Sequence, residues 1–107
     1  MFARTVTVRL KANMRADFQK TLENEIIPLL RKRQGFQDEL TLVSQDGNEA
    51  VGVSLWDTKQ NAESYQKETY PEVQKILSKV IDGTPQVKTY DVPYTTLTRV
   101  ARGTGSA

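Results

Sequence analysis

Hydrophobic residues recur along this chain with two different periods, and the order in which the periods alternate is what most constrains the fold. Residues 2–12 alternate apolar and polar positions, a pattern typical of a half-buried strand. Residues 14–34 then carry apolar side chains at helical spacing, and Pro28 is expected to kink this helix because it lacks a backbone donor. The chain therefore begins with a strand followed by a helix.

The rest of the chain repeats this order with one extra strand. Residues 37–46 and 49–56 alternate again and are joined by the turn sequence "DGN". A helical pattern runs from about residue 59 to residue 81 and breaks at residues 69–71, because a residue that precedes proline disfavours the helical conformation. Residues 85–92 are expected to form a fourth strand. The order β-α-β-β-α-β predicts an α+β, ferredoxin-like fold, with a four-stranded antiparallel sheet and both helices on one face.

The length and composition indicate one small, polar domain. The 107 residues are 37% hydrophobic, and the mean hydropathy is −0.55. We expect a folded domain over residues 1–98 and a disordered tail over residues 99–107. Because so short a chain buries only about two-thirds of its unfolded surface, this composition favours association with a second copy.

The chain contains no cysteine and no histidine, which excludes many kinds of site. Disulfides, iron–sulfur clusters, thiolate zinc sites, histidine triads and histidine-ligated haem are ruled out, so we expect no metal and no cofactor. The formal net charge of +2 does not require a nucleic-acid partner. No apolar run resembles a signal peptide or a membrane span, so the sequence predicts a cytoplasmic protein that does not bind membranes.

Strand alternation divides the residues of the sheet between two faces. We expect the helices to cover the face made by Val6, Val8, Leu10, Leu40, Leu42, Val51, Val53 and Leu55. We expect the uncovered face to carry Thr5, Thr7, Arg9, Thr41, Val43, Gly52, Ser54, Trp56 and, on the last strand, Tyr90.

An uncovered face with a tryptophan beside small residues has two interpretations. It packs against a second copy as a filled core, or it leaves a pocket in which Trp56 is a wall. Arg9 is either an interface ion pair or a ligand contact. Tyr65 and Tyr70, on the broken helix, are most simply packing residues.

Several stretches together resemble the antibiotic biosynthesis monooxygenase family. They are "GF" after the first helix, the strand ending in "LW", the segment "WDTKQNAESYQKETYPEVQ" and the strand "VKTYDVPY". The resemblance implies a homodimer with the dimeric α/β-barrel fold and a pocket between the sheet and the helices of each protomer. It also implies activities that range from cofactor-free oxidation of phenols and quinols to haem degradation and processing of a signal aldehyde.

The sequence departs from this family at positions that carry chemistry. The first-strand asparagine of haem-degrading relatives corresponds to Val6, and their histidine falls near Gln74, so haem degradation is disfavoured. Some phenol oxygenases have an asparagine four residues before the tryptophan, where this chain has Gly52.

The resemblance and the face assignment together nominate a site. The expected substrate-binding residues are Trp56, Thr7, Thr41, Gly52 and Ser54, and the candidate catalytic residues are Arg9, Tyr65 and Tyr90. Arg9 or Lys88 would stabilise an anion and a tyrosine would relay a proton, while Glu39 shares the face of Thr41.

Two functions follow. The first is a monooxygenase that oxidises a small phenolic or quinol compound without a cofactor and acts as a homodimer. The alternative is a non-catalytic dimer that binds a small aromatic molecule or serves in a stress response.

Overall fold

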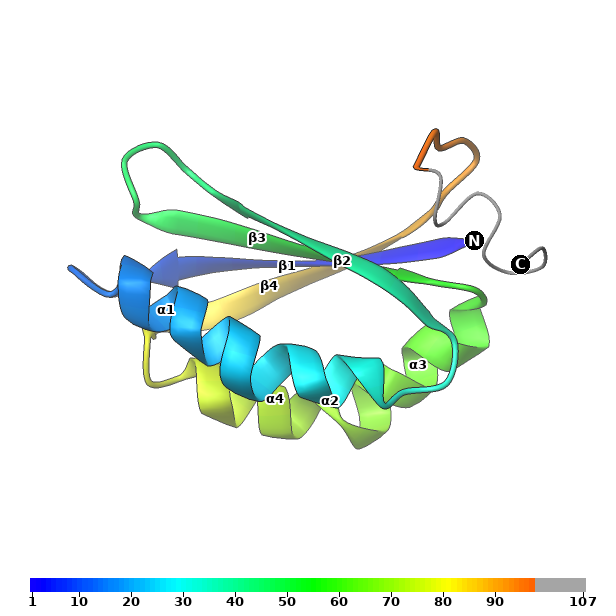
Figure 1. Cartoon of the computed structure of the whole chain (residues 1–107), viewed down its shortest axis with the longest axis horizontal. Coiled ribbons are helices and arrows are strands. Elements are labelled where there is room, and N and C mark those ends of the chain that lie inside the picture. Colours follow the sequence, from blue (N-terminus) through cyan, green and yellow to red (C-terminus); the bar gives the residue numbers. More distant parts are fainter. Residues whose placement is uncertain (98–107) are drawn as a thin grey trace.

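A computed structural model describes residues 1–97, which form one antiparallel sheet with helices on one side (Figure 1). The strand order β2-β3-β1-β4 and the element order confirm the predicted α+β, ferredoxin-like βαββαβ fold. Three helical segments, α1, η1 and α2, lie between the first two strands, and two more, α3 and α4, lie between the last two. The elements are β1 Phe2–Leu10, α1 Arg15–Thr21, η1 Leu22–Ile26, α2 Ile27–Arg31, β2 Phe36–Val43, β3 Glu49–Trp56, α3 Lys59–Glu68, α4 Tyr70–Leu77 and β4 Ile81–Asp91.

The first helix is disrupted in front of Pro28, as the sequence predicts. The disruption is η1, a π-helical turn, after which α2 begins with Pro28 in its first turn. Proline has no N–H to donate to the preceding turn, and its ring crowds the carbonyl four residues earlier. The wider π-helical turn accommodates both effects without ending the helix.

The second helix divides at Thr69, between α3 and α4, which confirms the predicted break. Thr58 caps α3, and its side chain accepts a hydrogen bond of 3.1 Å from the backbone N–H of Asn61. The predicted end of the helix near residue 81 is wrong, because α4 stops at Leu77 and Ile81 already belongs to β4. The apolar spacing at Ile81 fitted a helix, but this buried residue pairs with Leu10 in the sheet.

β4 is longer than predicted and contains an irregularity. Its pairing with β1 shifts register between Thr7 and Arg9, where the partner of Thr7 is Gln86 and the partner of Arg9 is Asp82. Gly83 lies in this stretch with φ +73°, a backbone conformation that favours glycine. The Asp82-Gly83 pair, expected to end a helix, thus lies within the bulged part of a strand.

The predicted division of the sheet into faces is right for β1 and wrong for β2 and β3. Directly paired residues share a face, and Val6 pairs with Gly52, which in turn pairs with Thr41. Val6 lies on the helix side as expected, so Gly52 and Thr41 lie there too. The same pairing carries Val43, Ser54 and Trp56 to the helix side and leaves Leu40, Leu42, Val51, Val53 and Leu55 on the uncovered face.

Trp56 therefore belongs to the core under the helices, and its predicted place on the uncovered face is wrong. Its exposed fraction is 0%, and its ring meets that of Phe36 edge-on at 5.7 Å and that of Tyr65 at 5.1 Å between centroids. It pairs with Phe2 on one side and Phe36 on the other, so three aromatic residues lie side by side at one end of the sheet, where Trp56 packs against Tyr65 of α3.

The predicted tail and the predicted absence of a membrane span concern the end of the chain and its helices. The predicted disordered tail, residues 99–107, lies outside the described residues. Within residues 1–97, no helix is long and apolar enough to cross a membrane.

Candidate functional site

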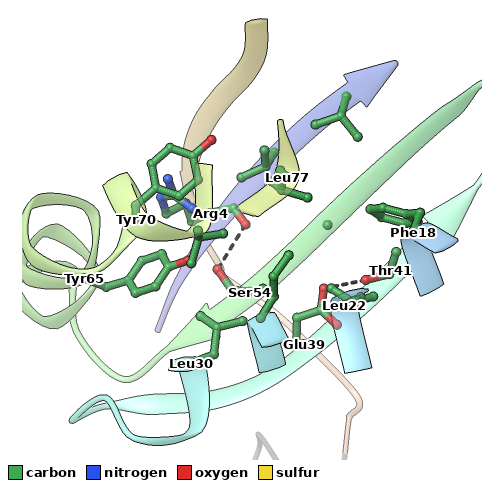
Figure 2. Close-up of a pocket in the computed structure, with 15 residues that line it drawn as sticks. Arg4, Phe18, Leu22, Leu30, Glu39, Thr41, Ser54, Tyr65, Tyr70 and Leu77 are labelled. Atoms are coloured by element: carbon green, nitrogen blue, oxygen red, sulfur yellow. Dashed lines mark hydrogen bonds between the residues drawn. The ribbon is translucent and has the colours of Figure 1, made fainter. Parts of the chain in front are cut away.

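A pocket lies between the helix side of the sheet and the helices, and residues of three adjacent strands form its floor (Figure 2). Each strand pairing places three residues in a row across β1, β3 and β2. The middle residue of every row is small, because β3 contributes Ser54, Gly52 and Ala50 in turn. Two rows, Arg4–Ser54–Glu39 and Val6–Gly52–Thr41, line the pocket in full, whereas only Val8 of the next row, Val8–Ala50–Val43, lines it.

The walls of the pocket are apolar. The first helix presents side chains spaced by four residues, and α3 and α4 close the other side. The free volume is about 60 Å³, enough for a few water molecules. The wall residues are Phe18, Leu22, Ile26, Leu30, Tyr65, Tyr70, Val73 and Leu77.

Arg4 is a buried cation at one edge of this pocket. Its exposed fraction is 3%, and its guanidinium lies over the ring of Tyr70 at 4.2 Å and that of Tyr65 at 5.1 Å. The guanidinium donates from Nε to Oε1 of Gln66 at 2.9 Å, and its Nη2 donates to the same oxygen. Burial lowers the pKa of Arg4, but an arginine starts so high that it stays charged at neutral pH.

No carboxylate neutralises Arg4 within the described residues. The ion pair found there joins Arg33 to Glu68 at 2.8 Å and does not involve Arg4. A buried charge without an opposite charge is costly, and the two tyrosine rings offset part of that cost. Sequence reasoning did not name Arg4, although its position was visible: it is in phase with Val6 on the buried side of β1.

The two tyrosines beside Arg4 both have raised pKa values. Burial raises the pKa of Tyr65 to about 12, while the charge of Arg4 acts in the opposite direction. Burial also raises the pKa of Tyr70 against the opposing charge of Arg4. The Tyr70 hydroxyl is buried and has no hydrogen-bond partner in the structure. Both phenols are therefore neutral donors at physiological pH.

Glu39 lies at the opposite edge of the same floor row as Arg4. The Thr41 hydroxyl donates to its Oε2 at 2.6 Å. Burial raises the pKa of Glu39, and the Thr41 hydrogen bond partly offsets this rise. A Cβ at Gly52 would lie 3.4 Å from Oε2, so the Glu39 carboxylate lies directly over this glycine of the floor. A carboxylate with a raised pKa is a stronger base than an ordinary one.

Trp56 supports the pocket from behind and does not line it. Its Nε1 donates to the Ser54 hydroxyl at 2.9 Å, and that hydroxyl donates to the backbone oxygen of Arg4 at 3.4 Å. Its indole also packs against Tyr65. The tryptophan thus fixes two lining residues, a role that its predicted place on the uncovered face did not suggest.

The structure brings together half of the residues that the sequence nominated. Thr41, Gly52, Ser54 and Tyr65 line the pocket, and Trp56 lies directly behind it. The others lie on the uncovered face: Thr7 pairs with Val51 and Gln86, Arg9 is exposed, and Tyr90 and Lys88 pair with Ala3 and Thr5. The anion-stabilising role expected of Arg9 or Lys88 therefore has no place in this pocket.

The described residues contain no cluster of three or more acidic side chains that would hold a metal ion. The titratable groups lining the pocket are Arg4, Glu39, Tyr65 and Tyr70. What they offer chemically is one positive charge, one base of raised pKa and two neutral phenol donors around an apolar space.

No protein-family model and no curated protein matches the sequence. Solved structures do match its fold. The monooxygenase ActVA-Orf6 of Streptomyces coelicolor, in complex with nanaomycin D, is 18% identical, with 90% of each chain covered and a TM-score of 0.76. SnoaB of Streptomyces nogalater, a cofactor-independent oxygenase, is 13% identical over 90% of this chain and 96% of its own, with a TM-score of 0.73.

A Nitrosomonas europaea protein with the provisional name antibiotic biosynthesis monooxygenase is 16% identical, covers 88% of this chain and 100% of its own, and has a TM-score of 0.72. The same organism also provides a match of unknown function. At these identities the likeness concerns the fold, and a shared fold does not establish a shared activity. The chain therefore shares its α+β, ferredoxin-like fold with these antibiotic biosynthesis monooxygenase structures.

Proposed function

We propose that this protein is a cofactor-independent monooxygenase that oxidises a small phenolic or quinol compound in the pocket between sheet and helices. One observation carries the proposal: Arg4 and Glu39 lie at opposite ends of one floor row, across an otherwise apolar space. A cation and a base in a water-poor site are what an oxygenase without a cofactor needs.

Glu39 is the base in this proposal. A quinol reacts with oxygen far more readily after it loses a proton, because the resulting anion is electron-rich. Burial raises the pKa of Glu39 toward that of its substrate, which increases the driving force for proton transfer. Thr41 holds the carboxylate in place through the hydrogen bond of 2.6 Å.

Arg4 provides the positive charge that holds an anionic substrate. Its guanidinium is fixed by Gln66 and two tyrosine rings, so it is in position before the substrate arrives. Oxygen itself is the oxidant. A dihydroxyarene gains one oxygen atom, the second oxygen atom leaves as water with two hydrogens from the substrate, and a hydroxyquinone is formed.

The free space requires that substrate binding enlarge the pocket. About 60 Å³ is less than the roughly 150 Å³ that a benzene-sized cavity provides. Gln66, at the Arg4 edge, is exposed and has several rotatable bonds, so we place the adjustment at this side chain while Arg4 stays over the two tyrosine rings.

Oxygen uptake tests the proposal. A panel of hydroquinones and naphthoquinols is mixed with the protein, and oxygen consumption is followed with an electrode. We expect Glu39→Gln to reduce the rate at least about a hundredfold, which is the usual contribution of a positioned base. Glu25→Gln, at an exposed carboxylate of the first helix, is the matched control and should keep the full rate. Equal rates for the two variants would contradict the role of Glu39.

A non-catalytic binding protein is the second candidate. Gly52 favours it, because the asparagine that some phenol oxygenases carry at this position is missing. Tight binding of an aromatic compound with no oxygen uptake across the panel would support this candidate.

We also propose that the protein acts as a homodimer. The uncovered face carries Leu40 and Leu42, which are 56% and 51% exposed, beside the half-buried Val51, Val53 and Leu55. A contiguous apolar surface of this kind is typical of a protein interface. The cytoplasmic location predicted from the sequence stays a prediction.

A further inference from the structure

We infer that the pocket is built for an aromatic ligand that carries a carboxylate, which replaces the Gln66 amide as the partner of Arg4. This inference deepens the proposed function, since it concerns the same pocket and specifies the substrate class as hydroxylated aromatic carboxylates. The inference depends on the burial of Arg4, on the contacts of Arg4 and on the residue that lies across the pocket from Arg4.

Among residues 1–97 the guanidinium of Arg4 has no anionic partner. It is 97% removed from solvent, and its hydrogen bonds from Nε and Nη2 both end on the single amide oxygen of Gln66. A guanidinium has a planar, two-pronged set of donors that matches the two oxygens of a carboxylate. Here both donors share one amide oxygen, so the place of the second carboxylate oxygen is not taken.

A carboxylate is a better partner for this group than the amide is. Hydrogen bonds between two charged groups are roughly twice as strong as those that involve neutral ones. A ligand carboxylate at Arg4 would also remove the cost of an uncompensated buried charge. The Tyr70 hydroxyl, buried beside the same guanidinium and without a partner, offers a further donor to a ligand oxygen. Gln66 thus serves as a replaceable acceptor that keeps Arg4 in place until the ligand arrives.

The opposite edge of the pocket requires a different end of the ligand. Arg4 and Glu39 are two strands apart in one row, which separates their backbones by roughly 10 Å at about 4.8 Å per strand. A carboxylate cannot face Glu39 without repulsion, whereas a hydroxyl can donate to it. Between the two edges the walls are largely apolar, and the one hydroxyl in this floor row, that of Ser54, is already hydrogen-bonded to Trp56 and the backbone of Arg4, so an aromatic ring fits there. The ligand is therefore oriented, with its carboxylate at Arg4 and its hydroxyl at Glu39.

Binding without turnover tests this inference. The probes are 2,5-dihydroxybenzoate and its neutral amide, 2,5-dihydroxybenzamide, titrated in the absence of oxygen at pH 7. Trp56 is the only tryptophan and packs against the pocket residue Tyr65, so its fluorescence reports occupancy, and calorimetry provides the affinity. We expect the carboxylate to bind at least tenfold more tightly than the amide.

Two variants remove the preference in different ways. Gln66→Glu places a permanent carboxylate on Arg4, so the acid should lose its tenfold advantage while the amide binds as before. Arg4→Met removes the charge and should abolish the preference as well, with circular dichroism to check that the fold is kept. Arg31→Met, at an exposed arginine at the end of α2, is the matched control and should keep the preference.

Each outcome decides the matter. Equal affinity for acid and amide, failure of both to bind at millimolar concentration, or an unchanged preference in Gln66→Glu would overturn the inference. None of these results measures oxidation. A strong preference for the acid without oxygen uptake would instead leave this inference standing and contradict the proposed monooxygenase.

Discussion

Glu39 is a carboxylate whose ionisation the fold opposes. Burial raises its pKa above the ordinary value of 4.5. Between the unfolded and the folded pKa, the folded chain binds more protons than the unfolded chain, so stability falls as the pH rises through this window. Ionisation of Glu39 in the folded protein therefore lowers the free energy of unfolding.

Replacement of Glu39 by glutamine should consequently stabilise the protein while it inactivates the site. We expect Glu39→Gln to raise the free energy of unfolding at pH 7 relative to the wild type. The effect should be smaller below pH 4.5, where protonation makes the wild-type side chain neutral, like that of the variant. Urea denaturation at the two pH values measures this. A variant that is less stable at pH 7 would show that the carboxylate is structural.

Single residues of the pocket were only partly predictable. Thr41, Gly52 and Ser54 were predicted to share one face with Trp56, and they do, but the face on which the group lies was assigned wrongly. Arg4 was not predicted; Arg9, the predicted arginine, lies on the same strand but on the opposite face. To choose between Arg4 and Arg9, one must know which face of β1 meets the helices. The apolar residues Val6, Val8 and Leu10 indicate that face, and Arg4 is in phase with them.

Elements meet closely at Gly35, between α2 and β2. This glycine has φ +86°, and its carbonyl accepts a hydrogen bond of 2.9 Å from the N–H of Asp57 at the end of β3. The Asn61 side chain donates to Asp57 Oδ1 at 2.9 Å. A Cβ on Gly35 would come within 2.7 Å of Asn61 Cβ and closer still to Asp57 Oδ1, so no other residue fits this junction.

Gly35→Ala should therefore be markedly more destabilising than the same change at Gly47. Gly47 in the β2–β3 turn has φ +78° but nothing within 4 Å of a Cβ, so alanine there costs only conformational strain of about 1–2 kcal/mol. At Gly35 steric overlap adds to the strain, and we expect a loss of about 3 kcal/mol or more. Chemical denaturation of both variants makes the comparison, and equal losses would contradict the close packing at this junction.

The elements themselves were largely predictable, and the reason is physical. Strong periodicity defined the first helix, the break in the second helix and three of the four strands to within a few residues, and the capping residue Thr58 marked the start of α3. The faces of β2 and β3 were not predictable in the same way, because both of their faces carry apolar side chains. Alternation reveals which residues share a face, but it cannot reveal which face meets the helices when the other face is also apolar.

On the scale of the whole molecule, the uncovered face should bring two chains together. Leu42 is 51% exposed and is surrounded on this face by Leu40 and Val51. We expect a mass of 24.2 kDa in sedimentation, twice the 12.1 kDa of one chain. Leu42→Asp places a charge in the proposed interface and should shift the mass to that of one chain at micromolar concentration.

A control separates this effect from a general effect of charge. Gln60→Asp adds the same charge at an exposed position of α3, away from the sheet, and should leave the mass unchanged. A wild-type mass of 12.1 kDa would instead mean that the apolar face serves another partner.

The π-helical turn decides how the first helix meets the pocket. Phe18, Leu22, Ile26 and Leu30 all line it, and they are spaced by four residues. In a regular α-helix of 3.6 residues per turn, such a series drifts around the axis by about 40° per step, or about 120° over the four positions. The wider turn at Leu22–Ile26 unwinds the helix and cancels part of that drift. A kink that proline alone seemed to explain thus also aligns one continuous apolar stripe, and a straight helix of the same sequence would rotate one end of it away from the ligand space.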